Sequence, residues 1–424
     1  MFHHPVWLKR ALVFTLLLAI APAAQPIIDS APHKPRPRSE TAGIAAQGTP
    51  EEMIVAAIDA IRAGRSKDAL ATVDRLLEVE PNYRLAHLLR ADLYAMRAMP
   101  LSTIGGGALA PADRLEDLRR EALVRIKRHL APPPAQTLPA NLLTFGPQQK
   151  YAILVDVSAA RLFLFENHQG VPRLVTDNYI TIGKLGAQKQ REGDQRTPIG
   201  VYFVTGNMPR SQLDKTYGAQ ADLYGVGAWP ISYPNELDRR EGRTGHGIWL
   251  HGSPAQTYAR PPQASNGCVV LTNPEMQKIA AYLQIGVTPV VITERIDWVS
   301  QAEWKTRQGQ VLAQINNWRS AWESLDTQRY LGFYGQQFKS EEGQDIQNWK
   351  RQKMSVNSSK QWSQVKLDDL SIFSTGGANP MLVSSFSQEY KSNNLSNRMK
   401  KRLYWKQENG NWRIVWEGTA NAGA

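Results

Sequence analysis

Two proline-rich segments divide this chain of 424 residues and constrain what it can fold into. One covers residues 25–50, and the other covers residues 131–148 and contains Pro132-Pro133-Pro134. Proline has no amide hydrogen to donate and fixes its own backbone angle, so we expect a tether in the first segment and a linker in the second. A chain of this length also exceeds one ordinary core of about 100–200 residues. The sequence therefore predicts a multidomain protein with folded regions at residues 51–130, 149–295 and 305–420.

The first 24 residues have the pattern of a secretory signal peptide. Lys9 and Arg10 precede an apolar run from Ala11 to Ile20, and small residues with one proline follow. Because this run is too short to cross a bilayer as a stable helix, we predict that residues 1–24 are cleaved. The mature chain would then lie in the periplasm without a transmembrane segment, and an uncleaved N-terminal anchor is the alternative.

The charge of the chain favours an acidic partner. Fifty Lys and Arg residues against 38 Asp and Glu residues give a formal net charge of +12. Such a charge suits nucleic acid, an anionic membrane face or an acidic wall polymer. Because an exported protein rarely meets nucleic acid, we exclude that partner and expect a polymer of the cell envelope.

Periodicity predicts a different structure for each region. In residues 51–130, Ile54, Ala57 and Ile58 recur at helical spacing, which predicts an α-helical region that is either tetratricopeptide-like or a plain helical hairpin. Residues 149–295 contain short β-branched and apolar runs between Gly- and Pro-rich loops, which predicts a mostly-β domain. Residues 305–420 begin with an amphipathic helix and end in a hairpin at Asn409-Gly410, which predicts an α+β cone.

Cys268 is the only cysteine, which excludes a disulfide within the chain. It follows Ser265-Asn266-Gly267, a turn too small and polar for a core strand, and it lies 17 residues after His251, which ends an apolar run. A thiol becomes a nucleophile when a nearby imidazole accepts its proton. Gly267 permits close backbone approach, so the amides of Gly267 and Cys268 are candidate donors to an oxyanion. A buried thiol beside a hydrogen-bonded histidine is the alternative without chemistry.

These residues resemble the L,D-transpeptidase catalytic (YkuD) domain of bacterial peptidoglycan enzymes. The shared motifs are His251-Gly252, Ser265-Asn266-Gly267-Cys268, and the run Thr197-Pro198-Ile199-Gly200-Val201-Tyr202. The resemblance implies that Cys268 is the nucleophile, that His251 is the base, and that the Gly252 carbonyl orients the imidazole. It also implies an oxyanion hole of Gly267 and Asn266 amides, with that of Cys268, and a substrate among the peptidoglycan stem peptides. It implies no cofactor.

Two positions depart from the family pattern. Asn266 replaces the usual histidine of the turn, and Val270 replaces the usual arginine or asparagine two residues after the cysteine. Candidate substrate-binding residues are Ser265, His246 and Arg260, and the other arginines that could compensate for Val270 are Arg243 and the Arg239-Arg240 pair. We predict no metal site, because His246 and His251 lie five apart on one expected strand and would face opposite sides.

Three functions remain open. The first is an L,D-transpeptidase that passes the acyl group from Cys268 to an amine, and the second is an L,D-carboxypeptidase in which water takes that place. The third is a wall-binding scaffold without activity. The C-terminal region is similar to the nuclear-transport-factor-like (NTF2-like) cone of some wall-modifying enzymes, including L,D-carboxypeptidases that set cell shape in helical bacteria. Other envelope proteins are expected partners of the helical and C-terminal regions.

Overall fold

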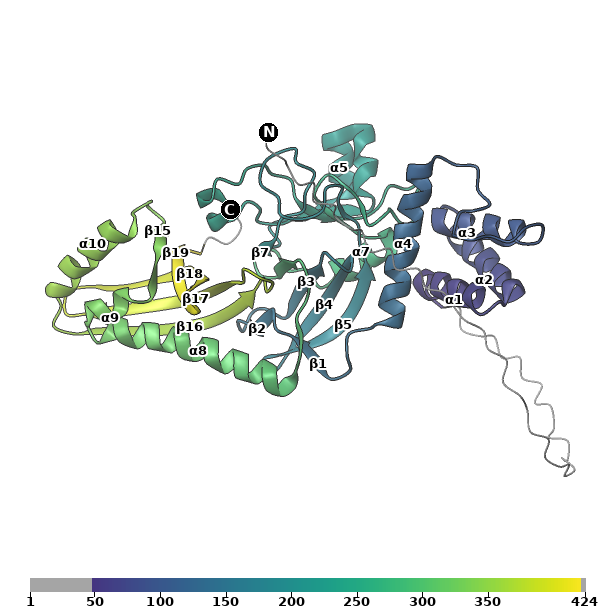
Figure 1. The fold of residues 1–424 in the computed structure, drawn as a ribbon. Helices are drawn as coiled ribbons and strands as arrows, with labels where there is room; N and C mark the ends of the chain where they lie inside the picture. Colours follow the sequence, from purple (N-terminus) through teal and green to yellow (C-terminus); the bar gives the residue numbers. More distant parts are fainter. Residues whose placement is uncertain (1–47, 421–424) are drawn as a thin grey trace, which may run out of the picture. The chain divides into compact units, whose positions relative to one another are not determined.

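The computed structural model describes residues 48–420 (Figure 1). The expected signal peptide and nearly all of the expected tether lie outside these residues. The helical region consists of four helices, and Thr49 and Glu52 cap the first of them with reciprocal hydrogen bonds. The helices pack through Ile54, Ala57, Val73 and Leu76, which are completely buried. The bounds are α1 (Pro50–Arg62), α2 (Ser66–Val79), α3 (Arg84–Ala95) and α4 (Ala112–Leu130).

The helical region is therefore present, and its tetratricopeptide-like nature stays a prediction. None of the helices between residues 48 and 420 combines the length and the apolarity that crossing a membrane requires.

The segment at residues 131–148 differs from the expected linker, because it contributes strands to two sheets. Strand β1 (Thr137–Pro139) pairs with β14 (Trp298–Ser300), and β2 (Leu142–Thr144) pairs with β16 (Ser363–Ser374). Leu142 and Leu143 after the prolines are almost fully buried. The proline content predicted a linker, but burial of these leucines places the backbone beside strands that accept it as a partner.

The central domain is mostly β, as expected, and contains two main sheets. The first has the strand order β5-β4-β3-β13-β7, and the second has the order β12-β10-β9-β8. Ile153, Val155 and Leu164 of the first sheet share one buried core with Leu250 and Val269 of the second. The bounds are β3 (Tyr151–Asp156), β4 (Arg161–His168), β5 (Val171–Tyr179), β6 (Ile182–Gly183), β7 (Gly200–Phe203), β8 (Met208–Pro209), α5 (Arg210–Tyr217), η1 (Gly218–Tyr224), β9 (Gly227–Pro230), α6 (Glu236–Arg240), β10 (Trp249–His251), β11 (Gln263–Ser265), β12 (Val269–Val270), α7 (Asn273–Ala280) and β13 (Pro289–Thr293).

The C-terminal domain pairs helices with an extended sheet of order β15-β19-β18-β17-β16-β2, which fits the expected α+β cone. Its last hairpin turns at Asn409-Gly410, where both residues have a positive φ, as the sequence predicts. Aromatic residues fill its core, among them Trp318, Tyr330 and Trp405. The bounds are α8 (Gln301–Glu323), α9 (Thr327–Leu331), β15 (Tyr334–Ser340), α10 (Ile346–Ser358), β17 (Met381–Ser392), β18 (Ser396–Glu408) and β19 (Asn411–Thr419).

Candidate active site

Strands β10 and β12 bring the candidate nucleophile and base onto neighbouring backbone segments. They pair in parallel, with Leu250 opposite Val269 and His251 opposite Val270. Leu250, Val269 and Leu271 belong to the shared core. Because side chains alternate between the faces of a strand, His251 and Cys268 lie on the other face of the same strand pair.

His251 is held by its own backbone neighbour. Its side chain is buried, and its Nδ1 lies 2.7 Å from the Gly252 carbonyl oxygen. A carbonyl can only accept, so Nδ1 carries the proton and Nε2 keeps a free lone pair. The pKa of His251 is lowered to about 4, because burial and the positive charge of Arg260 outweigh the raising effect of the Gly252 carbonyl. The imidazole is therefore neutral near pH 7 and can accept a proton.

Glycine at position 252 has a steric reason. A Cβ atom there would lie 2.1 Å from Asn273 Oδ1, far inside contact distance. That same Oδ1 accepts a hydrogen bond from the Val226 amide at 3.1 Å. Glycine, which has no Cβ, therefore follows His251 because any other residue would clash with Asn273.

Cys268 is a free cysteine and is partly exposed as a residue. Burial of the sulfur raises the pKa of Cys268 to about 11, although the Trp249 backbone and the charges of Arg260 and Lys189 lower it. Its Sγ lies 3.3 Å from the Gly247 carbonyl oxygen, and no hydrogen bond joins it to His251 in the described residues. The arrangement is therefore a neutral thiol beside a neutral imidazole.

Ser265 shapes the turn before Cys268 from inside the protein. Its hydroxyl accepts from the Gly267 amide at 3.1 Å and donates to the Cys268 carbonyl at 2.7 Å. The side chain is 2% exposed, so it does not form the substrate-binding contact that the sequence suggested. The Gly267 amide is also occupied, which differs from the expected oxyanion hole. The amides of Asn266 and Cys268 donate to no protein acceptor between residues 48 and 420, and they are the available pair.

Thr197 explains why the Thr-Pro motif accompanies the cysteine turn. Its buried hydroxyl donates to the Gly267 carbonyl at 2.9 Å and accepts from the Gly183 amide at the same distance. Gly267 has a φ of +125°, and a Cβ there would lie 2.8 Å from the Arg196 carbonyl oxygen. The motif therefore clamps a backbone that only glycine adopts without strain.

The other sequence candidates differ in burial and in their contacts. Arg260 is near the site, because its charge acts on both Cys268 and His251, and its guanidinium donates to the Ala264 carbonyl. His246 lies in a loop before β10, not on the strand where we expected it, and its side chain is 82% exposed. Within the described residues, no group of His, Cys, Asp and Glu side chains could hold a metal ion.

The arginines proposed to compensate for Val270 are committed elsewhere. Arg243 pairs with Asp238 and Glu241, and Arg239 donates to the Pro234 carbonyl. Arg240 donates to the Val415 and Gln337 carbonyls of the C-terminal domain. Val270 itself is 2% exposed. Arg260 is therefore the one arginine of this set beside the thiol.

Sequence reasoning missed Tyr224, which ends η1. Its ring centroid lies 5.3 Å from that of His251 in an edge-on arrangement. Burial raises the pKa of Tyr224, and the negative charge of a Cys268 thiolate would raise it further. No motif marks Tyr224, because it enters the site from the end of η1, 27 residues before His251.

Two family models match this chain. Residues 150–292 match the L,D-transpeptidase catalytic domain (YkuD), and residues 310–418 match the Cds6 C-terminal NTF2-like domain. The chain therefore joins an L,D-transpeptidase catalytic domain, of a family that acts on peptidoglycan, to an NTF2-like domain of the Cds6 type.

Two solved structures resemble most of this chain. Bd1075 from Bdellovibrio bacteriovorus is 29% identical, with a TM-score of 0.58, over 67% of this chain and 98% of its own. The helical cell shape determining protein Pgp2 from Campylobacter jejuni is 26% identical, with a TM-score of 0.55, over 66% of this chain and 95% of its own. No curated protein sequence gave a significant match.

Proposed function

We propose that Cys268 attacks the carbonyl carbon of the third residue in a peptidoglycan tetrapeptide stem and releases the terminal D-alanine. The observation that carries this proposal is the hydrogen bond of 2.7 Å between His251 Nδ1 and the Gly252 carbonyl, which leaves Nε2 as a proton acceptor on the strand beside Cys268. Cys268 is partly exposed as a residue, which gives a substrate a route toward its thiol. Lone buried cysteines have neither feature.

The reaction begins with rotation of the thiol away from the Gly247 carbonyl. The sulfur then forms a bond to the substrate carbonyl carbon as its proton passes to His251 Nε2. The amides of Cys268 and Asn266 donate to the oxyanion of the tetrahedral intermediate. The carbon–nitrogen bond to D-alanine breaks, and the proton on His251 moves to the departing amine, which leaves a thioester on Cys268.

The fate of the thioester distinguishes two candidate functions. In an L,D-transpeptidase an amine of another stem or of an envelope protein attacks it, which is the activity for which the catalytic family is named. In an L,D-carboxypeptidase water attacks it and leaves a tripeptide. The second candidate is favoured by the NTF2-like domain and by the similarity to a protein that determines helical cell shape.

The test incubates the purified protein with a disaccharide tetrapeptide and separates the products by mass. A cross-linked dimer supports transpeptidation, whereas tripeptide and free D-alanine support hydrolysis. Cys268→Ala should abolish both products, and His251→Ala should slow acylation by about 10²–10⁴-fold. His168→Ala is the matched control, because it removes an exposed imidazole of β4 in the same domain, and it should keep full activity. Turnover by Cys268→Ala would refute the assignment.

We also propose that the protein acts in the periplasm. The support is the signal-peptide pattern of residues 1–24 together with a catalytic domain whose family acts on peptidoglycan. Fractionation of cells that express the tagged protein tests this location, and recovery in the cytoplasm would contradict it.

A further inference from the structure

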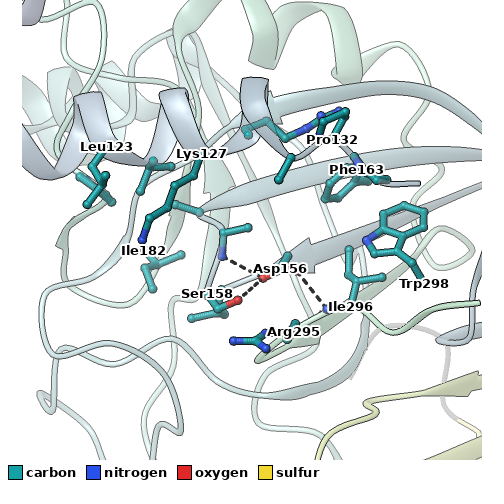
Figure 2. A pocket seen from close by; sticks show the side chains of 18 of the residues that line it. Leu123, Lys127, Pro132, Asp156, Ser158, Phe163, Ile182, Arg295, Ile296 and Trp298 are labelled. Carbon is teal, nitrogen blue, oxygen red and sulfur yellow. Dashed lines mark hydrogen bonds between the residues drawn. The ribbon is translucent and has the colours of Figure 1, made fainter. Parts of the chain in front are cut away.

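A cavity of about 700 Å³ lies apart from the candidate catalytic residues. Helix α4 and the prolines after it form one wall, and residues of the catalytic domain form the other (Figure 2). Its volume falls within the range of about 300–1,000 Å³ that small-molecule sites occupy. Cys268 and His251 do not line it.

The apolar part of the cavity comes from both walls. In Figure 2, Leu123 lies toward one end of the cavity, and Pro132, Phe163, Ile296 and Trp298 lie toward the other. The Leu123 side chain is 49% exposed, although large aliphatic residues are usually buried. These surfaces suit methyl and methylene groups of a ligand.

The charged part of the cavity is strongly basic. Arg120, Lys127, Arg128 and Arg295 line it, against the single carboxylate of Asp156. That carboxylate is already used, because it accepts from the Ser158 hydroxyl and the Ala159 and Ile296 amides at 2.9–3.0 Å.

Two of the four cations lack an internal counter-ion. Arg120 lies 3.5 Å from Glu116, and Arg128 pairs with Asp177. Lys127 and Arg295 form no ion pair with any carboxylate between residues 48 and 420. An anionic ligand would therefore find two available cations in one apolar cavity, where charge-assisted hydrogen bonds are strongest.

The cavity is linked to the cysteine turn by one pair of strands. Ile182 of β6 and Gln263 of β11 both line it, and they pair with each other. The next pair along these strands is Gly183 with Ser265. Gly183 is held by Thr197, and Ser265 shapes the turn of Cys268. A ligand in the cavity would thus contact the strands that support the catalytic turn.

We propose that this cavity binds a second peptidoglycan stem peptide, one that is not being cleaved. Its carboxylates would meet Lys127 and Arg295, and its alanine methyl groups would meet the apolar wall. This inference rests on the proposed function for the identity of the polymer. Two sites on one polymer would increase the effective concentration of the substrate stem at Cys268.

The test uses the stem tripeptide L-Ala-γ-D-Glu-diaminopimelate carrying a diazirine, with labelled positions mapped by mass spectrometry. The purified protein should be labelled within residues 123–134 or 295–298. The double variant Lys127→Glu/Arg295→Glu should lose at least about tenfold of this labelling, because each lost charge-assisted bond is worth about one power of ten. A probe with amidated carboxylates should label wild type equally poorly.

Three controls keep the outcome clear. The double variant Lys305→Glu/Lys339→Glu makes the same charge change at two exposed lysines of α8 and β15 outside the cavity, and it should label like wild type. Lys127→Arg/Arg295→Lys should keep the labelling, and thermal unfolding checks that the charge-reversed protein folds. Undiminished labelling of the folded double variant, or labelling only elsewhere, would overturn the inference. Release of D-alanine by wild type tests the proposed function separately, since labelling does not need Cys268.

Discussion

The catalytic domain contacts both the helical region and the C-terminal domain through buried arginines. The two interfaces differ in whether their residues connect to the candidate active site. On the helical side, Arg125 is 1% exposed, forms an ion pair with Glu121 at 2.9 Å and lies 3.9 Å from the ring centroid of Tyr179. The Tyr179 hydroxyl donates to the Arg260 carbonyl at 2.8 Å. The positive charge of Arg260 in turn lowers the pKa of both Cys268 and His251.

The helical side also holds the loop between the two catalytic candidates. The Tyr258 amide donates to the Asn82 carbonyl, and the Tyr258 ring centroid lies 4.7 Å from that of Tyr83. On the C-terminal side, Arg402 donates to Glu236 at 2.8 Å and lies over the Phe203 ring. Glu236 and Phe203 have no contact with the cysteine turn among their hydrogen bonds. We infer that the helical region supports the candidate active site, whereas the NTF2-like domain packs on parts of the catalytic domain that do not contact this site.

The largest expected effect comes from removing the arginine at the helical interface. Arg125→Met leaves the buried Glu121 without its cation and also breaks the pair with Glu51. Breaking a buried pair in this way costs about 3–5 kcal/mol of unfolding free energy. Urea denaturation measures it. Arg90→Met is the control, since its pair with Asp74 is about 40% exposed and should cost about 1 kcal/mol or less. Equal losses in the two variants would contradict the buried role of Arg125.

The corresponding change on the C-terminal side should affect stability alone. Glu236→Gln weakens the hydrogen bonds that Arg402 and Tyr404 donate to this carboxylate. Bonds to charged groups contribute about 1.5–3 kcal/mol, so the unfolding free energy should fall by up to this amount. The kcat/KM for a soluble tetrapeptide should stay at the wild-type value. A tenfold fall in kcat/KM of the folded variant would show that this interface also reaches the site.

The sequence predicts local motifs, but it does not predict contacts between residues that are far apart along the chain. The Asn409-Gly410 hairpin follows from a local motif and forms where the sequence predicts it. The Cys268 turn and the His-Gly pair are also local motifs, and they lie on neighbouring strand segments. The aromatic residue beside His251 was not predicted, because Tyr224 reaches the site through long-range packing of η1. The strands within residues 131–148 were not predicted, because their proline content indicated a linker and their partner strands β14 and β16 lie far along the chain.

Assignments that depend on hydrogen bonding were the least predictable. Ser265 looked like a substrate contact and Gly267 looked like an oxyanion donor, yet they bond to each other. Sequence spacing brings residues near one another but does not say which donor meets which acceptor. The compensating arginines illustrate the same limit, since Arg240 is drawn to carbonyls of a domain far along the chain.

The pH dependence tests whether burial in the catalytic domain keeps His251 neutral. Burial and the Arg260 charge lower the pKa of this imidazole from 6.5 to about 4, so its neutral form persists to lower pH. At pH 5.5 an unshifted imidazole would be about one-tenth neutral. We therefore expect kcat/KM at pH 5.5 to be close to its value at pH 7, with the acid limb near pH 4. Glu236→Gln should leave that limb in place, and a wild-type limb near pH 6.5 would contradict the shift.

The smallest expected effect separates the interfaces most cleanly, because it removes one hydroxyl from each. Tyr179→Phe deletes the donor to the Arg260 carbonyl, which keeps a second donor in the Thr181 hydroxyl at 3.0 Å. The unfolding free energy should therefore fall by about 0.5–1.5 kcal/mol, the ordinary contribution of one hydrogen bond. If loss of this bond also shifts Arg260, kcat/KM should fall by about two- to tenfold. Tyr404→Phe is the matched control, since it deletes a hydroxyl that donates to Glu236 at 2.7 Å. Its unfolding free energy should fall by a similar or larger amount while kcat/KM does not change. If both variants lower kcat/KM equally, Tyr179 has no special coupling to the site, and the helical region would be a structural support like the C-terminal domain.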